Sequence, residues 1–160
     1  MSVTPSQTVG PYFQIGLIDE RWTQMATGSG ERITIEGTVF DAEGNPVTDA
    51  MVEIWQPNCG AFGRFAVDPA SGRFGFECTQ PAPGAEGAPH LCVGVFARGL
   101  LKRLYTRMYF DGGAANATDP ILSLVPVERR STLVAVAAGA GRYTFDVRLS
   151  GPGETVFFEC

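Results

Sequence analysis

Histidine is the scarcest chemically versatile residue of this chain, since His90 is the only one among 160 residues. Any Ser/His/Asp or Cys/His arrangement would have to use that imidazole, and no Gly-x-Ser-x-Gly nucleophile elbow accompanies it. The segment Gly139-Ala-Gly141 lacks the rest of a dinucleotide-binding fingerprint. These absences argue against nucleophilic catalysis and against dinucleotide binding by this chain.

Clusters of basic residues and long apolar runs are also missing. The chain has 12 Lys and Arg against 17 Asp and Glu, a formal net charge of −5, and its adjacent basic residues are only pairs such as Arg129 and Arg130. This balance argues against a nucleic-acid partner. No run approaches the ~18 apolar residues of a membrane span, and no basic start followed by an apolar segment marks a signal peptide. We therefore expect a soluble, cytoplasmic protein without a membrane partner.

The cysteines show no C-x-x-C spacing. They are Cys59, Cys78, Cys92 and Cys160. Without an export signal, we expect free thiols. His90 and Cys92 form a His-x-Cys pair with two zinc donors, whereas a zinc site takes three or four ligands. We therefore expect no metal bound by this chain, and a lone His at the start of an apolar strand is more simply a core histidine.

Glycine and proline are abundant instead, with 20 Gly and 11 Pro spread along the chain, as is typical of an all-β domain with many turns. Residues 33–40 and 50–55 alternate with a period of two around a turn-rich segment at 41–46, which predicts two half-buried strands that pair as a hairpin through a polar turn. Further strands are expected at 74–76, 91–97, 104–110, 133–137, 142–149 and 155–158. The strand at 91–97 is almost continuously apolar and should be central. The sequence thus predicts an antiparallel β-sandwich of about eight strands with long loops, among them a Gly-rich loop at 57–65.

One short helix is expected at 119–125, with Asp119 as its N-cap and Pro120 in its first position. Residues 1–30 are predicted to form an N-terminal arm and loop. The aromatic pair Tyr12-Phe13 beside a Gly-Pro bend indicates that this arm docks on a surface, either its own sandwich or another chain. No repeat or linker divides the sequence, so residues 1–160 are predicted to form a single domain.

The run from Gly37 to Gln56, Gly-Thr-Val-Phe-Asp-Ala-Glu-Gly-Asn-Pro-Val-Thr-Asp-Ala-Met-Val-Glu-Ile-Trp-Gln, resembles the core of the intradiol ring-cleavage dioxygenases. That family holds a ferric ion with two tyrosines and two histidines. Here His90 matches the first histidine of a His-x-His pair, and Cys92 replaces the second. The segments 59–65 and 78–90, where the ligand tyrosines would be expected, contain no tyrosine. The resemblance therefore implies degenerate ligand positions and no iron in this chain.

Other stretches resemble the iron-free α chains of those family members that are built from paired α and β chains. These stretches are residues 4–13, 96–111, 119–130 and 151–158. The resemblance implies a homologous β subunit that binds Fe(III), with αβ units assembled into a larger ring or cage. It also implies an enzyme that uses O2 to cleave a small aromatic substrate, 3,4-dihydroxybenzoate, to 3-carboxy-cis,cis-muconate. This chain alone would be inactive.

The same resemblance implies which residues of this chain approach the partner's iron pocket. They are Thr8, Gly10, Pro11 and Tyr12 of the arm and Arg98 of an Ala-Arg-Gly turn. Arg98 follows an apolar strand and precedes a glycine, so its guanidinium can face an anionic aromatic substrate. The alternative for Arg98 is an ion pair between the chains. No catalytic residue is expected in this chain.

A reading from another class is a non-enzymatic, transthyretin-like β-sandwich module for binding or assembly, which would share only the Gly-Asn-Pro-Val turn. Such a module has no reason to keep the arm and the Arg98 turn. It should also stay monodisperse alone, whereas an isolated α chain should expose a large apolar interface. The segment between Trp55 and Phe74 is shorter than the resemblance leads us to expect.

Overall fold

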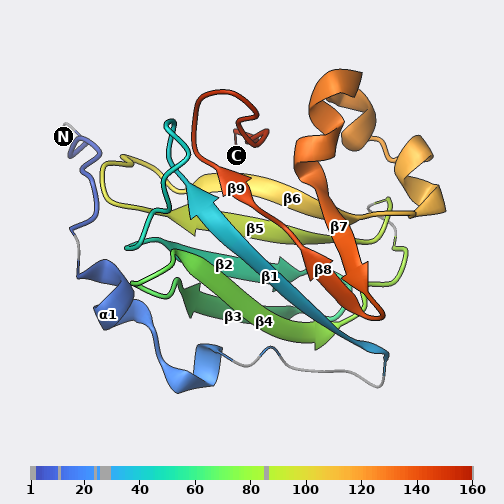
Figure 1. The fold of residues 1–160 in the computed structure, drawn as a ribbon, viewed down its shortest axis with the longest axis horizontal. Helices are drawn as coiled ribbons and strands as arrows, with labels where there is room; N and C mark the ends of the chain where they lie inside the picture. The colour runs from blue at the N-terminus through green and yellow to red at the C-terminus, as the bar shows by residue number, and fades with distance from the viewer. Residues whose placement is uncertain (1–2, 11, 24, 26–29, 85–86, 160) are drawn as a thin grey trace.

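The computed structural model describes residues 3–10, 12–23, 25, 30–84 and 87–159. Within these residues nine strands form a mixed sheet in the order β3-β2-β5-β6-β7-β8-β1-β4, with β9 beside β1 (Figure 1). Phe65 of β3 and Phe76 of β4 stack with ring centroids 5.0 Å apart, so the two ends of this path meet across the core. The predicted all-β class is confirmed.

The strands are β1 (Arg32–Phe40), β2 (Met51–Gln56), β3 (Ala61–Ala66), β4 (Arg73–Thr79), β5 (His90–Phe96), β6 (Leu104–Phe110), β7 (Val134–Gly139), β8 (Arg142–Thr144) and β9 (Val147–Arg148). The helical segments are α1 (Phe13–Leu17) and the 3-10 helices η1 (Glu20–Trp22), η2 (Ala114–Thr118), η3 (Leu122–Leu124) and η4 (Val127–Leu133). Among the described residues, none of these helices has the length and apolar character needed to cross a membrane.

Strand pairing departs from a fully antiparallel sandwich. Five of the described pairs are antiparallel, whereas β1–β8, β1–β9 and β6–β7 are parallel. The predicted pairing of the first two strands is wrong, because β1 pairs with β4 while β2 lies between β3 and β5. The turn itself forms, since the Asp41 carboxylate accepts hydrogen bonds from the amides of Glu43 and Asn45. Beyond it, however, the chain crosses to the other layer. Alternation shows that a strand is half-buried but not which strand it pairs with.

The predicted Gly-rich loop at 57–65 is also wrong in its second half, which is strand β3. A tight turn, closed by the Gly60 amide on the Gln56 carbonyl at 3.0 Å, returns the chain directly along β2. Gly60 has a φ of +66°, which favours glycine. Gly63 lies inside strand β3, where an added Cβ would collide with the ring of Phe65, so the packing there favours glycine. Gly60 thus permits a tight turn, whereas Gly63 permits close packing inside a strand. The amino-acid composition of the segment does not distinguish these two roles.

The expected helix at 119–125 is only the 3-10 turn η3, and the α-helix of the described chain is α1 in the arm. The predicted cap is present, since Asp119 accepts hydrogen bonds from the amides of Ile121 and Leu122. Pro126 disfavours a helical conformation at Val125, whose ψ is 132°, and so ends the turn. The expected last strand at 155–158 does not form a named strand, because its amides bond to two different strands, β9 and β6.

The main core lies between the sheet layers and includes alternate residues of β1, β2, β5 and β6. Strand β5 is buried from His90 to Val95, between β2 and β6, which confirms the predicted central strand. A smaller cluster, around Tyr109 and Leu133, packs beneath the 3-10 turns that follow β6. The start of β5 therefore lies against two apolar clusters.

Candidate functional site

The two degenerate ligand positions lie at the start of β5. His90 and Cys92 are separated by one residue, so their side chains share one face of the sheet. The alternate residues Leu91 and Val93 belong to the main core, which places His90 and Cys92 on the opposite face. Across the neighbouring strands, Cys92 lies in register with Trp55 of β2. This face is the one on which the resemblance would place an iron site.

His90 is held in a fixed orientation. Its side chain is buried, its ring centroid lies 5.6 Å from that of Tyr109, and its Nδ1 lies 2.8 Å from the Ala88 carbonyl oxygen. Because a carbonyl can only accept, Nδ1 donates this hydrogen bond. Metal-ligating histidines are often oriented in this way. The orientation of one imidazole is thus retained without the rest of a ligand set.

The nearby phenols act as hydrogen-bond donors. The Tyr105 hydroxyl donates to Cys92 Sγ at 3.0 Å, and burial together with this hydrogen bond raises the pKa of Tyr105 to about 12. The Tyr109 hydroxyl donates to Asp119 at 2.9 Å, and burial and that hydrogen bond raise its pKa also. Both hydroxyls are thus bonded within this chain, and neither belongs to the segments 59–65 and 78–90 in which the resemblance places the ligand tyrosines.

The remaining surroundings do not suit a ferric ion either. Strand β3 brings Phe62 to this face opposite Trp55, and the Glu53 carboxylate near Cys92 pairs with Arg64 at 2.6 Å and with Arg103 at 3.8 Å. Among the described residues no group of three or more His, Cys, Asp or Glu side chains is placed to hold a metal. The described residues here therefore do not fit the family's ferric site of two tyrosines and two histidines. Cys59, Cys78 and Cys92 are free thiols, and Cys160 lies outside the described residues.

The predicted arm and the Arg98 turn come together in the structure. The Leu100 amide donates to the Ala97 carbonyl at 3.2 Å, and Gly99, in the third position of this turn, has a φ of +92°. The Gly99 amide in turn donates to the Thr8 hydroxyl at 2.7 Å. This hydrogen bond fixes the arm beside Arg98, although the two segments are far apart in the sequence.

Arg98 stands at the corner of this turn with its side chain 68% exposed, and its Nε lies 3.3 Å from Asp49 Oδ2. Sequence reasoning did not identify Asp49. The signal would have been its place just before β2, but only the register of Met51 with Phe96 reveals that Asp49 lies near Arg98.

The rest of the predicted set follows on the arm. Gly10 is exposed, with no atoms within 4 Å of an added Cβ. Tyr12 precedes α1 and is 76% exposed. Pro11 lies outside the described residues. The described members of this set are thus open to solvent in the single chain.

The two groups of predicted residues lie at opposite ends of β5. Strand β5 begins at His90 and ends at Phe96, just before Arg98. Its length corresponds to about 20 Å at ~3.3 Å per residue. In Figure 1 the β5 arrow runs toward the side on which the arm and α1 lie. Thr8 and Arg98 therefore lie about 20 Å along the strand from His90.

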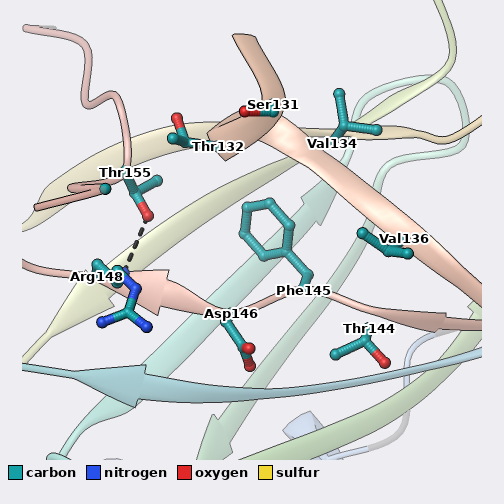
Figure 2. Close-up of a pocket in the computed structure, with 10 residues that line it drawn as sticks. Ser131, Thr132, Val134, Val136, Thr144, Phe145, Asp146, Arg148 and Thr155 are labelled. Atoms are coloured by element: carbon teal, nitrogen blue, oxygen red, sulfur yellow. Dashed lines mark hydrogen bonds between the residues drawn. The ribbon is translucent and has the colours of Figure 1, made fainter. Parts of the chain in front are cut away.

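A groove elsewhere contains none of these residues. It has a volume of about 390 Å³ and opens between β7 and the β8–β9 segment, with Phe145 and Val136 among its lining residues (Figure 2). Its Thr155 hydroxyl already accepts a hydrogen bond from the Arg148 amide at 3.0 Å. We assign no chemistry to this groove.

Comparison with known proteins gives consistent matches. The family model described as Dioxygenase matches residues 9–84. The protocatechuate 3,4-dioxygenase alpha chain of Burkholderia cepacia is 43% identical over 192 residues, covering 98% of this chain and 96% of that protein. The beta chain of protocatechuate 3,4-dioxygenase from the same organism is 30% identical over 179 residues, covering 88% of this chain and 75% of that protein.

A solved structure is similar over nearly the whole chain. It is the dioxygenase domain of a dioxygenase–carbohydrate-binding protein fusion from Streptomyces sp. SirexAA-E. It superposes with a TM-score of 0.64 at 25% identity, and the match covers 94% of this chain and 100% of that one. The sequence similarity to the alpha chain and the structural similarity to the dioxygenase domain therefore both extend over nearly the whole chain.

Proposed function

Because this chain belongs to the family of the protocatechuate 3,4-dioxygenase alpha chains, we propose that it is the iron-free subunit of a two-chain intradiol dioxygenase. The enzyme uses O2 to cleave 3,4-dihydroxybenzoate to 3-carboxy-cis,cis-muconate. The ferric ion belongs to a homologous β subunit, and this chain shapes the mouth of that subunit's pocket. A relative of the β kind is recognisably similar to this chain, which supports pairing between homologous subunits.

The observation that carries the proposal is the separation of the two groups of predicted residues. The arm is fixed to the Arg98 turn through Thr8, about 20 Å along β5 from His90. A side chain that is largely exposed in the single chain, on a turn fixed in this way, is suited to act in another chain's pocket. The same chain offers no ferric ligand set at His90 and Cys92 with which the arm could act.

Within this proposal Arg98 contacts the carboxylate of the substrate. A guanidinium presents N–H donors in a planar fork that matches a carboxylate, and its charge is retained at all physiological pH values. Gly10, Pro11 and Tyr12 shape the pocket mouth, Gly10 and Pro11 through their backbone. This division of roles gives the chain a part in substrate binding and none in the bond-making steps.

Exposed apolar side chains support a subunit interface that includes the arm and the outer face of the sheet. Tyr12, Ile15 and Leu17 of the arm and α1 are 76%, 72% and 46% exposed, and Trp55 on the outer sheet face is 44% exposed. Leu17 is fixed to that face, because Arg64 donates to its carbonyl oxygen at 3.0 Å. Aromatic and arginine side chains are enriched at such interfaces. We extend the proposal to αβ units assembled into a larger ring or cage in the cytoplasm.

Co-expression with an iron-bearing β chain tests this function. The expected result is a co-purified complex that contains iron, consumes O2 with 3,4-dihydroxybenzoate and forms 3-carboxy-cis,cis-muconate, whereas this chain alone is colourless and inactive. A chain that remains monomeric beside the β chain would favour the transthyretin-like binding module and contradict the proposal. Iron binding and activity of this chain alone would also contradict the proposal, because the chain would then be a self-sufficient enzyme.

A further inference from the structure

We propose that Asp49 is the positioning residue that holds Arg98 ready for the substrate carboxylate. The identity of the substrate in this inference rests on the proposed function. The pairing of Asp49 with Arg98 does not, because both residues lie within this chain. Asp49 itself would not touch the substrate. It would fix one edge of the guanidinium and leave the other edge for an aromatic acid.

Asp49 is placed for this role by strand register. It precedes Met51, which pairs with Phe96 at the end of β5, and Arg98 follows Phe96 by the same short distance. The connection into β2 and the turn after β5 therefore meet at one edge of the sheet. The Asp49 side chain is only 18% exposed, and it forms the less mobile half of the ion pair with Arg98.

The environment of the Asp49 carboxylate makes the pair more constrained than an ordinary surface ion pair. Its Oδ2 is shielded from solvent and accepts no aligned hydrogen bond from the described residues, so the Arg98 charge at 3.3 Å is what compensates its burial. A shielded carboxylate oxygen without compensation is unfavourable. The pair therefore restrains the arginine side chain, which otherwise has many rotamers.

The backbone of the same turn is restrained independently. The positive φ of Gly99 and the hydrogen bond from Leu100 to Ala97 set the turn, and the Thr8 hydroxyl accepts from the Gly99 amide. Asp49 thus restrains the side chain of a residue whose backbone is already fixed. Since Asp49 contacts Nε, the two terminal nitrogens of Arg98 remain for a bidentate contact with a carboxylate.

Steady-state kinetics of the αβ complex test this role with two substrates. Asp49→Ala should raise KM for 3,4-dihydroxybenzoate about two- to fivefold with kcat almost unchanged, the range that a partly exposed ion pair supports. Catechol has no carboxylate, so its KM should not change. Asp49→Glu keeps the charge and should restore KM, while Asp111→Ala, an exposed acidic residue, is the matched control. If Asp49→Ala fails to fold, Asp49→Asn replaces it, with the same expected rise.

An NMR measurement on the isolated chain separates this inference from the proposed function. The Nε–H signal of Arg98, assigned by its loss in Arg98→Lys, should shift in Asp49→Ala and return toward its wild-type position in Asp49→Glu. An unchanged signal would overturn the pairing whatever the enzyme does. A shifted signal with equal KM changes for both substrates would overturn the positioning role. If the wild-type complex fails to cleave 3,4-dihydroxybenzoate, the proposed function and with it the positioning role fail, whereas the pairing is still decided by the signal.

Discussion

Replacing Asp119 should destabilise this chain more than any surface change, because its carboxylate joins three segments at the His90 end of the sheet. Asp119 is 1% exposed. Its Oδ1 accepts from the Tyr109 hydroxyl and from the amides of Ile121 and Leu122, and its Oδ2 accepts from the Ala88 amide at 2.9 Å. Through Ala88 and Tyr109 this carboxylate supports two of the groups that contact the buried His90 ring.

The expected loss follows from the donors that each substitution leaves without an acceptor. Asp119→Ala leaves several buried N–H and O–H donors without an acceptor, and each unsatisfied donor costs about 1–3 kcal/mol of unfolding free energy. Because such costs are not additive, we expect a total loss of ~3–5 kcal/mol. Asp119→Asn can keep the oxygen at the Oδ1 position but turns an N–H toward the Ala88 amide, for a loss of ~2–3 kcal/mol. Urea unfolding followed by circular dichroism measures both. Asp111→Asn, at an exposed position, should stay within about 0.5 kcal/mol of wild type.

The pH dependence of the same measurement gives a second check. Burial opposes ionisation, but hydrogen bonds from the Leu122 and Ala88 amides and the Tyr109 hydroxyl lower the pKa of Asp119 below its ordinary value. A folded-state pKa below the unfolded one stabilises the chain above about pH 4, and this contribution is lost as the pH falls toward the folded pKa. The difference in unfolding free energy between wild type and Asp119→Asn should therefore shrink below about pH 4. A constant difference, or a loss under 1 kcal/mol at pH 7 for Asp119→Ala, would refute this reasoning.

Arg98→Ala in the complex should lower kcat/KM for 3,4-dihydroxybenzoate by about 1–3 kcal/mol, or roughly five- to 150-fold, and leave catechol kinetics unchanged; equal effects on both substrates would count against a carboxylate contact. Gly37→Ala should destabilise the fold by ~1–3 kcal/mol or more, because the added Cβ would collide with the Phe145 carbonyl, whereas Gly75→Ala meets only atoms at 3.7 Å and should unfold at nearly the wild-type urea concentration. In alkaline titration monitored by tyrosine absorbance, Tyr105→Phe should remove a group that ionises near pH 12, because burial raises its pKa to about 12. Since that folded pKa is raised, its contribution to stability is complete below about pH 10 and is lost as the pH rises toward 12.

Much of the strand content could be predicted from the sequence, because alternation and apolar runs are local signals. The strands at residues 32–40, 90–96 and 104–110 were found within a residue or two. Pairing was not predictable in the same way, since the partner of β1 is chosen by contacts distant in the sequence. Strand β3 was missed because Gly63 has the composition of a loop but the packing of a strand interior.

In the candidate site too, some features could be predicted from the sequence and others required the fold. The resemblance supplied Thr8 and Arg98, and the structure joins them through the Gly99 amide. Asp49 lies in the run that resembles the family core, but its relation to Arg98 arises from the register of β2 with β5 and could not be read from that run. The distance along the sheet between Arg98 and His90 also required the fold, and it supports the proposal that the arm acts in another chain's pocket.

The most direct test of that assignment is a titration of an isolated iron-bearing β chain with this chain, read as O2 uptake with 3,4-dihydroxybenzoate. The account predicts that activity rises with added chain and saturates at one chain per β subunit, and that a variant lacking residues 1–12 saturates at much lower activity. Activity that is independent of this chain, or full activity with the truncated arm, would contradict it.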